Sequence, residues 1–386
     1  MTHTTDILPI PFSRPSIDAS DIDAVVAVLR SGWLTTGPRV QEFERHFAEY
    51  VGASHGVAVS SGSAALHLSL IAADIGADAE VITTPLTFCA TANAIIHTGA
   101  RPVFADIDAS TMNLDPAAAA ASVTPRTRGL LPVHFAGRPA DMVALRALAG
   151  RHDLVVVEDA AHAIEAVSNA GKTGTTADFT CFSFYATKNL TTGEGGMVTT
   201  SSSRAADRLR VASLHGMSRN AWTRRARERS AQYDVLMAGF KYNMMDIQAA
   251  LALQQLARIE VMHGRRTQIW RAYDSAFQSL PLTTPRTVEP GTRHARHLYT
   301  VLVDEASCGR SRDDLAESLD ELGVATSVHF QALHLHAFYA DRFGLRRGMF
   351  PNAERVSDQT LSLPLSAAMT DAEVNRVIEA VTEVCH

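Results

Sequence analysis

Apolar residues recur at two spacings along the first half of the chain, and each spacing predicts a different kind of element. Short runs of apolar and β-branched residues predict strands over 56–60, 80–84, 102–107, 129–135 and 153–157. Between and before them, apolar residues repeat every three to four positions, which predicts helices. Strands that alternate with helices are typical of a largely parallel sheet with helices on both faces.

The pattern changes after residue 245. Apolar residues at helical spacing from 245 to about 280 predict one long helix, and three prolines then interrupt the chain near Gly291. A smaller α/β pattern follows, with a strand at 297–303, a helix at 312–322, a strand at 325–329 and a terminal helix from 371. We therefore predict a large domain over 1–255, N-terminal arm included, and a second part over 256–386 that holds the long linking helix and a small C-terminal domain.

Composition and charge exclude several classes of function. The chain is 46% hydrophobic and its net charge of −6 is scattered, so no basic run offers a surface for nucleic acid or an anionic membrane. No apolar stretch is long enough to span a bilayer, and residues 1–10 do not resemble a signal peptide. The four cysteines form no CxxC pair, and no acidic residue stands among His329, His334 and His336. We expect a cytoplasmic protein without a metal site.

Lysine is rare in this chain. Of 35 basic residues only Lys172, Lys188 and Lys241 are lysines. Arginine cannot act as a nucleophile at neutral pH, so a lysine that persists is a candidate reactive amine, although a genome that favours arginine would leave a few lysines by chance. Position favours Lys188, which stands in a small, hydroxyl- and glycine-rich segment with no acidic residue nearer than Glu194.

Segments of unusual composition follow the predicted strands, where ligands bind in open α/β sheets. Ser61, Gly62 and Ser63 open a helix and can bind a phosphate through backbone N–H groups, although an ordinary serine N-cap would look the same. Phe88 can stack on a ligand or belong to the core. Asp159 follows a buried run, and its carboxylate needs a cationic partner, either a ligand or a structural group.

Together with Lys188, these are the parts that pyridoxal 5′-phosphate (PLP) chemistry requires. An amine forms the Schiff base, and a carboxylate keeps the pyridine nitrogen protonated. An aromatic side chain stacks on the ring, and a turn rich in N–H groups holds the phosphate. The sequence therefore favours a PLP site at the carboxyl edge of the sheet.

The amino-acid sequences of these segments resemble those of the PLP-dependent nucleotide-sugar aminotransferases of the DegT/StrS family. The resemblance covers nearly the whole chain, in the family's order, through Ser31–Pro38, Glu158–His162, Phe182–Met197, Gly239–Ala250 and Val328–His334. It implies an α/β fold of the aspartate-aminotransferase type (PLP fold type I). Such a fold has a mostly parallel seven-stranded sheet and a smaller C-terminal α/β domain.

The resemblance also implies roles for individual residues. Lys188 would form the Schiff base and shuttle the proton, Asp159 would pair with the pyridinium, and His162 would contact the phenolic oxygen of the ring. Asn243 would reach the phosphate of the neighbouring subunit, in a homodimer with shared active sites. The remaining cofactor contacts would be Gly62, Ser63, Phe88 and Ser183, and the substrate contacts Trp33, Thr35, His329 and Phe330.

By the same resemblance, glutamate would donate the amino group and a ketone on a nucleotide-linked hexose would accept it. Segments 215–219 and 241–246 look more like members that aminate carbon 4 than those that aminate carbon 3. The alternatives are a 3-keto-sugar or keto-cyclitol aminotransferase and, from another class, a non-catalytic regulator that binds PLP or a sugar nucleotide. The arginine-rich stretch 219–229 is either a solvated helix face or a clamp for a diphosphate or dicarboxylate.

Overall fold

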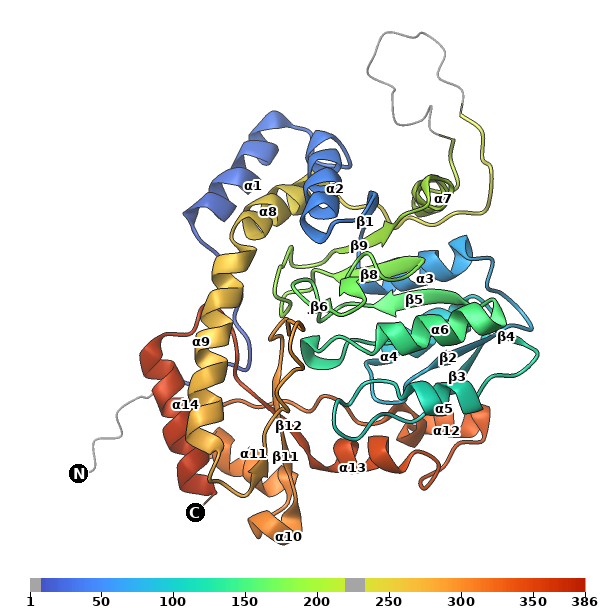
Figure 1. Ribbon diagram of the computed structural model, residues 1–386. Helices are drawn as coiled ribbons and strands as arrows, with labels where there is room; N and C mark the ends of the chain where they lie inside the picture. Colours follow the sequence, from blue (N-terminus) through green and yellow to red (C-terminus); the bar gives the residue numbers. More distant parts are fainter. Residues whose placement is uncertain (1–7, 219–232, 386) are drawn as a thin grey trace.

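A seven-stranded sheet forms the centre of the computed structural model, which describes residues 8–218 and 233–385 (Figure 1). The strand order is β1-β9-β8-β5-β4-β2-β3, and all these strands run parallel except β9. The predicted, mostly parallel sheet is confirmed. Its strands are β1 His55–Val59, β2 Glu80–Thr83, β3 Arg101–Phe104, β4 Thr127–Leu131, β5 Val155–Asp159, β8 Phe179–Ser183 and β9 Gly196–Thr200.

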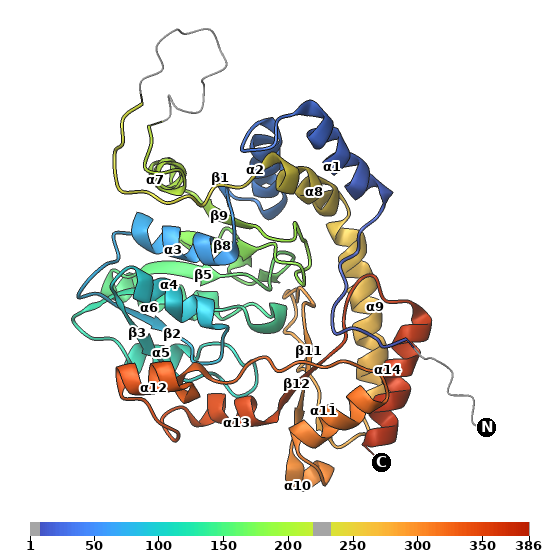
Figure 2. The same cartoon turned by 180° about the vertical axis from the view of Figure 1, so that it is seen from behind.

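Alternation along the strands explains why helices cover both faces. Successive residues of a strand point to opposite faces, so Val156 packs with α5 and α6, whereas Val157 packs with α3 and α7. Helices α5 and α6 cover the face seen in Figure 1, and α3 and α4 cover the face seen in Figure 2. The helices of this part are α1 Ala19–Ser31, α2 Pro38–Val51, α3 Gly62–Ala72, α4 Cys89–His97, α5 Pro116–Ala121, α6 Met142–His152, α7 Ser203–Ser213 and α8 Asp246–Ala257.

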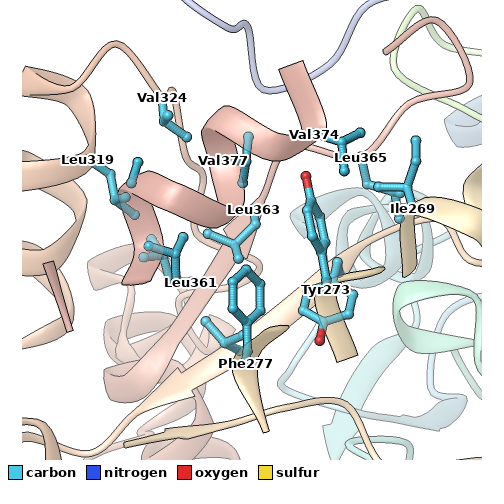
Figure 3. Packing of buried hydrophobic residues seen from close by; sticks show 14 of the residues in the cluster. Ile269, Tyr273, Phe277, Leu319, Val324, Leu361, Leu363, Leu365, Val374 and Val377 are labelled. Atoms are coloured by element: carbon cyan, nitrogen blue, oxygen red, sulfur yellow. The ribbon is translucent and has the colours of Figure 1, made fainter. Parts of the chain in front are cut away.

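A second core lies in the C-terminal part (Figure 3). There Tyr273 and Phe277 of α9 pack against Leu361 and Leu363 of β12, and Ile10 from the start of the described chain joins them. The elements are α9 Ile259–Phe277, β10 Leu282–Thr283, β11 Tyr299–Val303, α10 Glu305–Cys308, α11 Arg312–Glu321, α12 Ala337–Phe343, α13 Pro351–Gln359, β12 Thr360–Leu363 and α14 Asp371–Val384. The three strands pair antiparallel, and β6 Val167–Ser168 and β7 Gly171–Lys172 form a separate hairpin.

Two predicted elements of this part are wrong. The long helix from 245 to about 280 is two helices, because Arg258 leaves helical geometry (φ −105°, ψ 3°), and its guanidinium makes ion pairs with Asp18 and Asp21. The strand predicted at 325–329 forms only single bridges, since Ala325 donates to Ile10 and Ser327 pairs with β12. We propose that the two domains, over 1–255 and 256–386, divide near the α8–α9 junction. Within the described residues no helix is long and apolar enough to cross a membrane.

Candidate active site

A cavity of about 670 Å³ opens at the carboxyl edge of the large sheet, against the segment 327–330 of the C-terminal part of the chain. Loops that are far apart in the sequence meet there, as the convergence of parallel strand ends predicts. Nine residues predicted for the site line it: Gly62, Ser63, Phe88, Asp159, His162, Ser183, Lys188, His329 and Phe330.

Asp159 is the last residue of β5 and is only 7% exposed. One carboxylate oxygen accepts a hydrogen bond from the Thr91 hydroxyl at 2.8 Å, and the other accepts from the Ala161 N–H at 3.1 Å. Burial raises the pKa of Asp159, while the bond from Thr91 and the nearby Lys188 amine oppose that rise. A cationic group in the cavity would therefore be strongly stabilised by this carboxylate.

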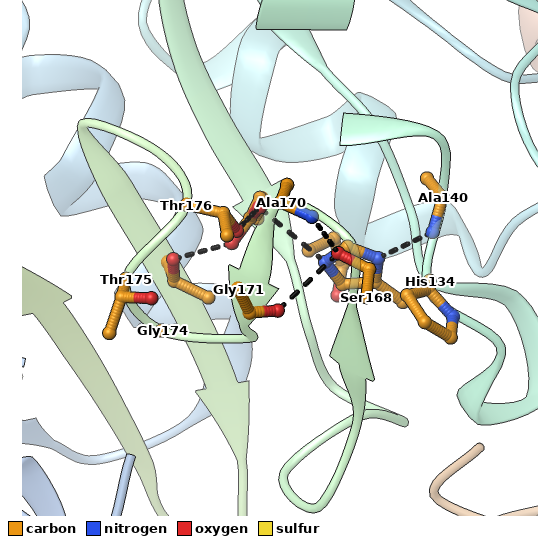
Figure 4. A network of polar contacts seen from close by, with 12 residues as sticks. His134, Ala140, Ser168, Ala170, Gly171, Gly174, Thr175 and Thr176 are labelled. Carbon is orange, nitrogen blue, oxygen red and sulfur yellow. Dashed lines mark hydrogen bonds and ion pairs between the residues drawn. The ribbon is translucent and has the colours of Figure 1, made fainter. Parts of the chain in front are cut away.

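The neighbouring carboxylate, Glu158, lies outside the cavity lining. Because successive strand residues point to opposite faces, its side chain reaches the hydroxyls of Thr176 and Thr180 instead. His134 approaches it to 3.8 Å, and Figure 4 shows the imidazole of His134 accepting from the backbone N–H of Ala140. The two adjacent acids thus have separate surroundings, one structural and one facing the cavity.

Lys188 follows β8 and shares the cavity with Asp159. Burial lowers the pKa of the Lys188 amine to about 8, and the attraction of Asp159 opposes this decrease. A substantial fraction of the amine is therefore neutral near physiological pH, and the neutral form is the nucleophile. The other two lysines lie elsewhere, since Lys172 donates to the backbone of Tyr50 and Lys241 is exposed beside Asn243.

The lowered pKa predicts how Lys188 reacts with a small aldehyde in cofactor-free protein. The protonated amine predominates below the pKa, so reductive methylation of Lys188 should rise with pH to a midpoint near 8. In Asp159→Asn the midpoint should fall, because the carboxylate that stabilises the ammonium is gone. Mass spectrometry of the peptides can follow each of the three lysines separately, with exposed Lys241 as the reference. A midpoint that rises in Asp159→Asn would contradict the coupling.

His162 is 8% exposed, and its Nδ1 has no hydrogen-bond partner among the described residues. Its ring packs against His297, with centroids 4.3 Å apart, and stacks on Phe330 at 6.1 Å. Burial and the nearby Lys188 amine hold the pKa of His162 well below its usual value, so the imidazole is neutral at neutral pH. An unpaired buried nitrogen at a cavity wall is suited to a polar atom of a bound ligand.

The turn before α3 has the geometry of an anion site. Ser61 caps the helix by accepting from the N–H of Ala64 at 3.0 Å, and the following residues line the cavity. A Cβ on Gly62 would lie 2.8 Å from the Cβ of Ser183, so only glycine fits there. The N-terminus of this 11-residue helix and the Ser183 hydroxyl suit a phosphate. These residues, with the unpaired His162 nitrogen and buried Asp159, fit PLP.

Three predicted site residues lie away from this cavity. Trp33 Nε1 donates to the carbonyl of Thr36, and the Thr35 carbonyl accepts from the N–H of Asp246. The Asn243 amide donates to the Thr36 hydroxyl at 2.6 Å. These residues gather beside the N-terminus of α8 and do not line the cavity of their own chain.

The prediction from sequence missed several residues of the cavity wall. His297, Tyr185, Phe12 and Ser13 line the cavity, and Thr91 supports Asp159. The sequence signals for them were the histidine at the start of the strand predicted at 297–303 and the position of Tyr185 within the segment Phe182–Met197. The arginine-rich stretch 219–229 lies outside the described residues. Within the described ranges no group of three or more His, Cys, Asp or Glu side chains could hold a metal ion.

Comparisons with known proteins agree with this geometry. Residues 15–382 match the model of the DegT/DnrJ/EryC1/StrS aminotransferase family. The spore coat polysaccharide biosynthesis protein SpsC of Bacillus subtilis is 51% identical over 377 residues, 97% of each chain. The PLP form of Spr1654 from Streptococcus pneumoniae is 33% identical, with TM-score 0.90 over 98% of each chain. DesV from S. venezuelae is 36% identical, with TM-score 0.87 over 98% of this chain and 99% of DesV.

Proposed function

Since this chain belongs to the DegT/DnrJ/EryC1/StrS aminotransferase family of PLP-dependent sugar aminotransferases, we propose that it transfers an amino group from L-glutamate to carbon 4 of a nucleotide-linked keto sugar. The observation that carries the proposal is the meeting of Lys188, Asp159 and His162 in one cavity. We also propose that the protein acts in the cytoplasm, where its four free cysteines stay reduced.

The proposed roles follow from the state of each side chain. When bound, PLP supplies an electron-withdrawing ring and carries the amino group between the two substrates. Lys188 Nζ, partly neutral near pH 8, would move one proton from the carbon of the amino donor to the cofactor carbon, and in the second half-reaction one proton from that carbon to the carbon of the keto sugar. The Asp159 carboxylate holds a positive charge at the buried end of the cavity, and neutral His162 offers a hydrogen bond without adding charge.

A second cavity supports a substrate larger than a free hexose. It measures about 680 Å³ and shares Thr87, Phe88, Val328 and Phe330 with the first. Arg312 and Arg347 line it. Arg347 is paired with Asp358 and Arg312 with Asp313, so an anionic group of the substrate would bind there by sharing or replacing these carboxylate partners. We therefore favour a nucleotide-linked sugar, with its sugar in the first cavity.

A screen of keto substrates tests the proposal. Glutamate should support amination of nucleotide-linked 4-keto hexoses at a higher kcat/KM than 3-keto hexoses, keto-cyclitols or free keto hexoses. The same assay decides between the 4-keto and 3-keto alternatives, which rest on segments 215–219 and 241–246. A higher kcat/KM for a 3-keto sugar or a keto-cyclitol would contradict amination at carbon 4 and favour the corresponding alternative. The non-catalytic alternative is not retained, since the family is one of aminotransferases.

We propose a homodimer in which Asn243 reaches the phosphate of the partner's site. Its amide offers an N–H donor, and Asn243→Asp would place a carboxylate against a phosphate, so each parent variant, Asn243→Asp and Lys188→Ala, should be nearly inactive. In an equal mixture that has been unfolded and refolded, half the dimers are hybrids with one intact site. The mixture should therefore regain about a quarter of wild-type activity. If confirmed subunit exchange restores no activity, Asn243 does not act across the interface.

A further inference from the structure

The residue after the proposed catalytic lysine, Asn189, is hydrogen-bonded on every side. Its amide nitrogen donates to both carboxylate oxygens of Glu165, at 2.9 and 3.2 Å, and to the carbonyl of Ala295 at 2.9 Å. Its amide oxygen faces Nδ1 of His297 at 3.0 Å. One amide therefore connects the Lys188 segment with an imidazole that lines the same cavity.

These bonds determine the tautomer of His297. A carboxylate only accepts, so the NH₂ of Asn189 must face Glu165 and its oxygen must face His297. Nδ1 of His297 therefore carries the proton and donates. Burial, with Lys188, His329 and Arg266 nearby, holds the pKa of His297 well below its usual value. The ring is then neutral, and Nε2 keeps its lone pair.

The network is anchored outside the cavity. Glu165 is fully buried and makes an ion pair with Arg266 of α9, which is 3% exposed. A buried pair of this kind is costly to break, so it fixes the direction in which Glu165 accepts. Helix α9 belongs to the small-domain core, and the anchor thus links that domain to the Lys188 segment.

His297 in turn supports the ring of His162. The two ring centroids are 4.3 Å apart with planes inclined at 36°, and Phe330 stacks on His162 with centroids 6.1 Å apart. Nδ1 of His162 has no hydrogen-bond partner among the described residues. Packing against the neighbouring rings therefore orients the His162 side chain.

We propose that Asn189 and His297 are positioning residues for the amino transfer. Asn189, oriented by Glu165, fixes the Lys188 segment and the Nδ1–H tautomer of His297, and His297 orients His162. The proposal rests on the roles proposed above for Lys188 and His162. A small misplacement of reacting groups can cost up to about a hundredfold in rate, so the effect should appear in kcat.

Two variants distinguish a loss of positioning at the active site, which lowers kcat, from a loss of protein stability, which lowers the Tm. Asn189→Ala removes the connecting amide, and Asn113→Ala removes a buried amide of similar bonding whose partners, Phe135, Arg138 and Pro139, do not line the cavity. Both should lower the Tm. Only Asn189→Ala should lower kcat by about tenfold or more, with little change in sugar KM, and shift the pH midpoint of the bound cofactor's visible absorbance.

Two substitutions of His297 each preserve one of its two interactions, either the hydrogen bond to Asn189 or the ring packing against His162. His297→Asn keeps an N–H donor toward Asn189, and His297→Phe keeps the ring against His162. Each should lower kcat and shift the absorbance midpoint, because both the bond and the ring are required. In cofactor-free protein, ¹⁵N-histidine NMR should assign His297 as the Nδ1–H tautomer, and Asn189→Ala should change that signal.

The proposal is overturned if Asn189→Ala matches Asn113→Ala in kcat and in absorbance midpoint, or if wild-type His297 carries its proton on Nε2. Its failure is distinct from failure of the proposed function. If the wild type does not transfer nitrogen from glutamate to any keto sugar, the proposed function fails. The NMR result can still be read in that case, because it needs neither cofactor nor substrate.

Discussion

Lys188→Ala is expected to lose essentially all transfer activity, by roughly a thousandfold or more, or about 4 kcal/mol of transition-state stabilisation. The reason is that no other lysine lines the cavity, so the amine proposed to move the proton has no substitute. The fold should persist, since the Lys188 amine makes no hydrogen bond within the described residues and only its backbone N–H is paired, with Tyr185. Steady-state rates and a thermal melt measure the two effects.

Lys172→Ala is the matched control for that loss. Lys172 is also partly buried, where it donates to the backbone of Tyr50 and lies 3.4 Å from the Tyr50 ring centroid. Its removal should lower the Tm and leave kcat within about twofold of wild type. Normal turnover in Lys188→Ala would refute the assignment of the catalytic amine.

Asp159→Asn should lower kcat by about a hundredfold while the KM for the sugar changes little. The substitution is nearly isosteric, and an amide can still accept from Ala161 and donate to the Thr91 hydroxyl. What it removes is the negative charge at the buried end of the cavity. Because charge there stabilises the reacting state rather than substrate binding, the loss should appear in turnover.

Glu158→Gln is the control that tests whether the fall in kcat expected for Asp159→Asn requires a carboxylate that lines the cavity. Glu158 is the adjacent carboxylate and is also buried, but it is bonded to Thr176 and Thr180 outside the cavity lining. Glu158→Gln should lower the Tm and leave kcat nearly unchanged. If Asp159→Asn behaves in the same way, the Asp159 carboxylate is structural.

The sheet and the cavity loops were predictable because their signals are local. The cores of β1 to β5 are short apolar runs that predict strands, whereas β8 and β9 were expected only from the seven-stranded sheet that the family resemblance implied. The carboxyl ends of parallel strands share an edge, which brings Gly62, Asp159 and Lys188 together without knowledge of side-chain contacts. The terminal helix and the strand from 297 were confirmed for the same reason.

The errors arose where tertiary contacts override local pattern. Periodicity continues through Arg258, where the helix ends and the guanidinium pairs with Asp18 and Asp21 at the N-terminal end of α1, more than 230 positions away in the chain. The bond between Asn189 and His297 spans 108 positions, and neither residue has a local signature for it. Of the three predicted residues that do not line the cavity, only Asn243 was expected to act at the neighbouring subunit, and the family resemblance alone implied that. Trp33 and Thr35 were predicted as substrate contacts, and nothing in the local sequence placed them beside α8.

The absorption spectrum of the purified PLP-loaded protein through one turnover tests the central claim most directly. Glutamate alone should remove the visible band as nitrogen passes to the cofactor, with one 2-oxoglutarate released per site. A nucleotide-linked 4-keto hexose should then restore the band and yield one 4-amino sugar. A band that glutamate does not change, or that no nucleotide-linked 4-keto hexose restores, would contradict the account.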